Sequence, residues 1–91
     1  MVKAQPVFVI SIEKYNNDEL VDFIADHVEK DHIKAINYAK QIAEDICSGK
    51  LVLMNNQFDS PVIYRDVFKY IVFDKGSRKN RIEVVYNWTR V

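Results

Sequence analysis

The stretch VIYRDVFKYIVFD (Val62–Asp74), followed after a short gap by RIEVVYNWTR (Arg81–Arg90), alternates apolar and polar residues over much of its length. A period of two is typical of β-strands, because successive side chains point to opposite faces of a sheet. The residues between the two runs, KGSRKN (Lys75–Asn80), contain the Gly-Ser pair expected of a hairpin loop. The pattern therefore predicts a long β-hairpin.

The two faces of this predicted hairpin differ in composition. One face is largely apolar, and we expect it to pack against the rest of the domain. It carries Val62, Tyr64, Phe68, Tyr70, Val72, Ile82, Val84, Tyr86 and Trp88. The other face mixes charged with apolar residues, and its apolar members form a candidate protein interface. These are Val67, Ile71, Phe73 and Val85.

Two segments upstream of the hairpin have the apolar spacing of amphipathic helices. The first runs from residue 19 to residue 30, with Asn16 as a candidate N-cap three residues before Glu19. At about 100° per residue, its apolar side gathers Leu20, Val21, Ile24 and Val28. The second runs from His32 to Ser48, between Asp31 as N-cap and Gly49 as the left-handed residue after its end. Its apolar side gathers Ala35, Ile36, Ala39, Ile42, Ala43 and Ile46.

The N-terminal segment Val7–Glu13 alternates like a strand, and Leu51–Met54 returns to extended structure before the loop 55–61. The element order is then β-α-α-β-β-β. We expect an α+β two-layer sandwich with a mainly antiparallel sheet and a helix pair on one face. A chain of 91 residues forms one domain of this kind, spanning residues 1–91.

Composition excludes several classes of protein. The formal net charge of zero argues against a histone-like protein and an acidic DNA mimic, and 48% hydrophobic residues argue against disorder. With only two glycines, the chain has neither a Walker loop nor a dinucleotide-binding turn, and we expect no cofactor. The lone Cys47 excludes an internal disulfide. Since no apolar run could cross a bilayer or act as a signal peptide, we expect a cytoplasmic protein without membrane contact.

The formal net charge of zero is the sum of two oppositely charged halves of the chain. Residues 1–61 contain six basic and ten acidic residues, a net charge of −4, whereas residues 62–91 contain seven basic and three acidic residues, a net charge of +4. The basic residues of the hairpin are candidates for binding nucleic acid or an acidic partner. They are Arg65, Lys69, Lys75, Arg78, Lys79 and Arg81. The alternative is that these charges only keep the surface soluble.

Four carboxylates fall on the outer side of the first predicted helix, where they either dock a basic partner or simply face solvent. These are Glu19, Asp22, Asp26 and Glu29. Neither histidine predicts a metal site, because His27 and His32 lie about 140° apart on a continuous helix. Cys47 lies in the last turn of a predicted helix near Asp45, where a thiolate is disfavoured, so we expect it to be structural.

These observations favour a non-catalytic binding protein over an enzyme. We expect an accessory or inhibitory protein that occupies a protein partner. The abundance of Asn, Ile, Lys and Tyr is typical of AT-rich phage and mobile-element genomes. Two alternatives remain at this stage. One is a module that binds RNA or single-stranded nucleic acid through its basic hairpin, and the other is a homo-oligomerisation domain, such as a homodimer.

Overall fold

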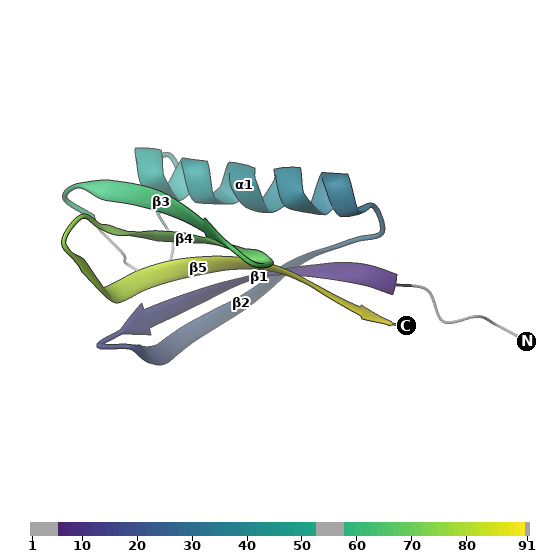
Figure 1. Ribbon diagram of the computed structural model, residues 1–91, viewed down its shortest axis with the longest axis horizontal. Coiled ribbons are helices and arrows are strands. Elements are labelled where there is room, and N and C mark those ends of the chain that lie inside the picture. Colours follow the sequence, from purple (N-terminus) through teal and green to yellow (C-terminus); the bar gives the residue numbers. More distant parts are fainter. Residues whose placement is uncertain (1–5, 53–57, 91) are drawn as a thin grey trace, which may run out of the picture.

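The computed structural model describes residues 6–52 and 58–90, the last two by their backbone only. Five antiparallel strands form one sheet in the order β2-β1-β5-β4-β3. In Figure 1 the single helix of the described residues, α1, lies along one face of this sheet. The elements are β1 (Pro6–Asn16), β2 (Glu19–Glu29), α1 (His32–Ser48), β3 (Pro61–Asp66), β4 (Lys69–Asp74) and β5 (Ser77–Arg90).

The predicted two-layer sandwich with a helix pair is therefore wrong. The first of the two predicted helices is the strand β2, so the element order is β-β-α-β-β-β. The centre of the sheet joins the two ends of the described chain, because β1 and β5 pair from Pro6 opposite Arg90 to Tyr15 opposite Arg81. Strands β2 and β3 form the two edges.

Strand β2 follows β1 through a tight turn at Asn17 and Asp18. Both turn residues have positive φ, 52° and 64°, which Asn and Asp tolerate better than most residues and which suits a two-residue hairpin. The pairing of β2 with β1 shifts register at two places, leaving Val21 and Asp26 without a direct partner. Each bulge breaks the alternation of β2, so its apolar residues recur at helical spacing although the segment is a strand.

Helix α1 confirms the second predicted helix at both ends. The Asp31 side chain accepts a hydrogen bond from the backbone N–H of Lys34, and Gly49 ends the helix in the left-handed conformation at φ 81°. Three alanines one turn apart on its inner side are fully buried and let the helix approach the sheet closely. These are Ala35, Ala39 and Ala43. Under them lie Ile10, Ile12, Tyr70, Val72, Ile82, Val84 and Tyr86 from β1, β4 and β5.

The long run expected over Val62–Asp74 is two strands, because the chain reverses at Val67 and Phe68. Directly paired residues share a face, and Val62 pairs with Phe73 while Tyr64 pairs with Ile71. Val62 and Tyr64 therefore lie on the face opposite α1, and their predicted place in the helix-facing core is wrong. Because a two-residue turn separates β3 from β4, even-numbered residues of β3 share a face with odd-numbered residues of β4.

The expected long loop between the last two strands is also shorter than predicted. Asp74 pairs with Ser77 around Lys75 and Gly76, and Gly76 takes φ 103°. Three residues of β5, Arg78 to Asn80, then bulge out of the ladder before Arg81 pairs with Phe73. Two of them hold the β1–β2 turn: the Lys79 carbonyl accepts from the N–H of Asp18, and Asn80 Oδ1 accepts from the N–H of Asn17. Of the segment 51–61, Leu51 and Val52 are not in a strand, Pro61 begins β3, and residues 53–57 lie outside the described residues.

Candidate functional site

Two surfaces of the fold are candidate sites. The first is the sheet face opposite α1, called here the open face, because no helix or strand among the described residues packs over it. Pairing assigns its members: Val9 lies opposite Val28, and Ser11 lies between Ala25 and Val85. Phe23 and Leu20 of β2 belong to the same face, opposite Glu13 and Tyr15.

The β2 side of the open face is apolar and exposed. Leu20, Phe23 and Val28 retain 53%, 52% and 59% of their accessible surface, and β2 contributes no charged side chain between them on this face. Val9 and Val85 beside them are half-buried. Large exposed apolar side chains gathered on one face are typical of an interaction surface.

The β4–β5 side of the open face carries an ion-pair network centred on Glu83. This buried carboxylate lies 2.8 Å from Lys69 Nζ and 2.7 Å from Arg81 Nε. Burial acts to raise the pKa of Glu83, but the hydrogen bonds from Lys69 and Arg81 outweigh it and hold the pKa below its usual range. Arg81 also pairs with Asp18 at 2.6 Å, and so ties the β1–β2 turn to β5.

Next to this network, Arg81 stacks over Tyr15, with 4.3 Å between the guanidinium carbon and the ring centroid. The Tyr15 hydroxyl donates a hydrogen bond of 2.9 Å to Glu13. Burial and that hydrogen bond raise the pKa of Tyr15 to about 12.

The four residues of the predicted protein interface do not lie together in the structure. Ile71, Phe73 and Val85 lie on the open face, but Ile71 and Phe73 are only 9% and 7% exposed. Arg78 covers Phe73, with its guanidinium carbon 4.8 Å from the ring centroid. Val67 is 72% exposed at the β3–β4 turn. The exposed apolar residues of β2 complete this face. The helical spacing predicts Leu20 and Val28 on the apolar side of a helix, and it does not single out Phe23.

The six predicted basic residues do not form one surface. Lys69 and Arg81 meet at Glu83, Arg78 lies over the rings of Tyr64 and Phe73, and Lys75 and Lys79 are exposed near the β4–β5 turn. Arg65 is directly opposite Tyr70, on the side of the sheet that faces α1.

The four predicted carboxylates do not line the outer side of a helix, because they belong to β2. Asp22 accepts a hydrogen bond from the N–H of Phe23, and Asp26 bonds to Tyr38 of α1. Glu29 accepts from the N–H groups of Asp31 and Lys30, and these bonds, with one from His27, lower its pKa. Glu19 is exposed at the start of the strand. The acidic excess of the first half of the chain thus lies along an edge strand.

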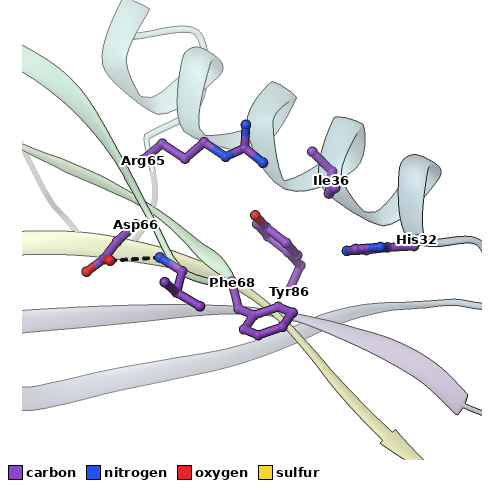
Figure 2. Close-up of a pocket in the computed structure, with 7 residues that line it drawn as sticks. His32, Ile36, Arg65, Asp66, Phe68 and Tyr86 are labelled. Carbon is purple, nitrogen blue, oxygen red and sulfur yellow. Dashed lines mark hydrogen bonds between the residues drawn. The ribbon is translucent and has the colours of Figure 1, made fainter.

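The second candidate site is a pocket of about 460 Å³ between the start of α1 and the β3–β4 turn. Figure 2 shows Tyr86 lying between Arg65 on one side and His32 on the other. The lining residues are His32, Ile36, Arg65, Asp66, Val67, Phe68 and Tyr86. Sequence patterns single out Arg65 and Val67 but do not connect them with His32, Phe68 or Tyr86, because no local pattern links residues of α1, β5 and a turn.

Aromatic contacts fix the far walls of this pocket. His32 stacks on Phe8 with 4.6 Å between ring centroids, and Phe68 meets Tyr86 edge-on at 6.0 Å. Phe68 holds φ 58°, which is uncommon for a bulky residue, and its carbonyl accepts a hydrogen bond from the N–H of Tyr86. Unusual backbone conformations of this kind are often found at functional sites.

The remaining residues considered from the sequence have structural contacts. His27 stacks on Tyr38 with 4.4 Å between ring centroids, and Cys47 is half-buried with its thiol 3.5 Å from the Pro61 carbonyl. Within residues 6–52 and 58–90, no three His, Cys, Asp or Glu side chains gather as they would around a metal ion. In the same part of the chain, no helix has the length and apolar character needed to span a bilayer.

Comparison of the chain with family models, curated proteins and solved structures gives no match.

Proposed function

We propose that the chain is a cytoplasmic, non-catalytic binding protein that acts by occupying a protein partner, as an accessory or inhibitory protein does. One observation carries the proposal: the open face presents Leu20, Phe23 and Val28, each more than half exposed, on the side of the sheet away from α1. Burying such side chains in a contact stabilises it by about 25 cal/mol for each Å² of apolar surface removed from water. A protein partner is the simplest means of covering them.

The test compares affinity capture by the wild-type protein with capture by Phe23→Asp. Phe23 is 52% exposed on an edge strand, so this substitution should leave the fold intact, unlike Ile71→Asp or Phe73→Asp, which would place a charge in a buried position. Ile33→Asp is the matched control, because Ile33 is 68% exposed on α1, away from the open face. Circular dichroism melts would establish that both variants are folded.

The proposal predicts that the wild type and Ile33→Asp retain the same protein after nuclease treatment, and that Phe23→Asp loses it. Hydrogen exchange of the captured complex should then show slower exchange in β2 and in the part of β1 opposite it. Equal capture by Phe23→Asp would contradict the open face as the contact. Retention that disappears with nuclease would favour the nucleic-acid alternative instead, and it should then weaken steeply with salt.

A further inference from the structure

The pocket beside α1 contains a buried hydroxyl that has no hydrogen-bond partner among residues 6–52 and 58–88. Tyr86 is 3% exposed, yet no described residue forms a hydrogen bond with its hydroxyl. In Figure 2 this hydroxyl points toward the space beneath Arg65. A buried hydroxyl that makes no hydrogen bond costs about 1–3 kcal/mol, so such groups usually have a partner. The hydroxyl at the wall of a pocket can find that partner in a bound molecule.

The pocket lining carries one cation, Arg65, and one carboxylate, Asp66, whose head groups point in different directions. Arg65 contributes a guanidinium that makes no ion pair within 4.0 Å among the described residues, whereas Lys69 and Arg81 are both paired with Glu83. The one carboxylate of the lining, Asp66, accepts a hydrogen bond of 2.7 Å from the N–H of Val67 and points away from the Arg65 head group in Figure 2. The first turn of α1 also begins here, and its N-terminus is already capped by the Asp31 carboxylate, so the attraction for an anion comes from Arg65.

The rest of the lining is apolar except for the His32 ring. Ile36, Val67 and Phe68 form walls around a volume of about 460 Å³, within the size range of small-molecule pockets. An apolar lining with a few converging hydrogen-bond donors selects a ligand that has an apolar body and one polar group. Because the converging groups are a guanidinium and a phenolic hydroxyl, that polar group must be an acceptor, and a charged one is held best.

We propose that this pocket binds a small organic anion, a carboxylate or phosphate monoester carried on a compact apolar body, with Arg65 and Tyr86 holding the oxyanion. Phe68 and Ile36 would contact the apolar body. The site lies on the α1 side of the sheet, away from the open face, and it does not depend on the protein contact proposed above.

The test is a titration of ¹⁵N-labelled protein with phenyl phosphate and, separately, with benzoate, followed by amide chemical shifts. Either probe should give saturable shifts around Ile36, Phe68 and Tyr86. The two probes distinguish a phosphate from a carboxylate ligand. Phenol and inorganic phosphate, which each lack half of the proposed ligand, should bind much more weakly. The inference is overturned if neither anion gives saturable shifts at millimolar concentration, or if inorganic phosphate binds as well as phenyl phosphate.

Two variants connect binding with the proposed residues. Arg65→Gln should weaken binding about tenfold, while Arg78→Gln, which removes an exposed arginine outside the pocket, should leave it unchanged. Equal binding by Arg65→Gln and Arg78→Gln would overturn the inference. Phe23→Asp should also bind normally, so failure of this proposal is distinguishable from failure of the open face.

Tyr86→Phe separates a ligand-binding role from a structural one. Since the hydroxyl has no partner among the described residues, removing it should leave the unliganded melting temperature unchanged or raise it. The same variant should bind phenyl phosphate or benzoate several-fold more weakly. A lower melting temperature without ligand would mean that the hydroxyl is bonded within the protein, and that result would contradict the inference.

Discussion

At the scale of single residues, Glu83 shows how a charge can be buried on a sheet face that no helix covers. Its side chain is 5% exposed, and Lys69 and Arg81 neutralise it from the neighbouring strand and from two residues away. An isolated buried carboxylate would be protonated instead of ionised. The two cations therefore hold Glu83 ionised at a buried position directly opposite Ile71.

Glu83→Gln should lower the stability at pH 7 by about 1–3 kcal/mol, because Lys69 and Arg81 would lose their shared counter-ion. The folded-state pKa of Glu83 lies below the ordinary value of 4.5, so the unfolded state binds the proton more readily. The stabilisation is therefore complete above 4.5 and decreases as the pH falls through the folded pKa. Urea denaturation between pH 7 and pH 3 should show the difference between variant and wild type shrinking on acidification.

The matched control for this prediction is Glu44→Gln. Glu44 is half exposed on α1 and lies 4.0 Å from Lys40, so its removal should change stability by less than about 0.5 kcal/mol at any pH. A wild-type to Glu83→Gln difference that stayed constant from pH 7 to pH 3 would argue against the assigned pKa shift.

At the scale of elements, what could be predicted from the sequence depended on how local the signal was. Both ends of α1 were predictable because an N-cap and a left-handed glycine act within a few residues of the helix. The first strand was predictable for a similar reason, since β1 keeps its alternation. Strand β2 was not, because two bulges bring its apolar residues to helical spacing. The Asn17-Asp18 pair is the local signal for a turn, but Asn and Asp are equally common at the start of a helix.

The turn gives a direct test of this correction. Asn17→Ala should destabilise the protein by about 1 kcal/mol, because alanine adopts positive φ less readily than asparagine. Asn17→Gly should be nearly neutral, since glycine adopts that conformation freely. Thermal melts of the two variants would distinguish a β-turn at Asn17 from the predicted helix start. At a helix start, alanine in this position would raise the melting temperature or leave it unchanged.

The pocket could not be predicted from the sequence for a physical reason. Its donors come from the α1-facing side of the β3–β4 hairpin and from β5, and only the reversal at Val67 and Phe68 brings Arg65 to that side. A phenylalanine at φ 58° is not a residue that turn propensities select. The pattern of Val62–Asp74 therefore predicts one continuous strand and gives no signal for the reversal.

At the scale of the whole molecule, stability should be graded across the sheet. Strands β1, β5 and β4 each have a neighbour on both sides, whereas β2 and β3 have one free edge. Amide hydrogen exchange should be slowest in β1, β5 and β4 and fastest in β2 and β3. Exchange in β2 as slow as in β1 would mean that something covers the β2 edge in solution.

Association between copies is the other property of the whole molecule to be measured. Sedimentation at tens of micromolar should give a monomer if the open face serves a different protein. A dimer that dissociates in Phe23→Asp but persists in Ile33→Asp would identify a second copy as the occupant, in line with the homo-oligomer alternative. The edge of β2 itself is a poor site for strand pairing between copies, because it carries two bulges and four carboxylates.

The pairing of β1 with β5 also has a consequence for synthesis. The central ladder joins the first strand to the last, so it cannot form until β5 has left the ribosome. Before then, the nascent chain has its local contacts, which are the β1–β2 hairpin, α1 and the β3–β4 hairpin, and their apolar inner sides lack the cover that β5 provides. Long-range pairing of this kind slows folding relative to helical domains of similar length. The period during translation is thus when the protein is most open to aggregation or to capture by a chaperone.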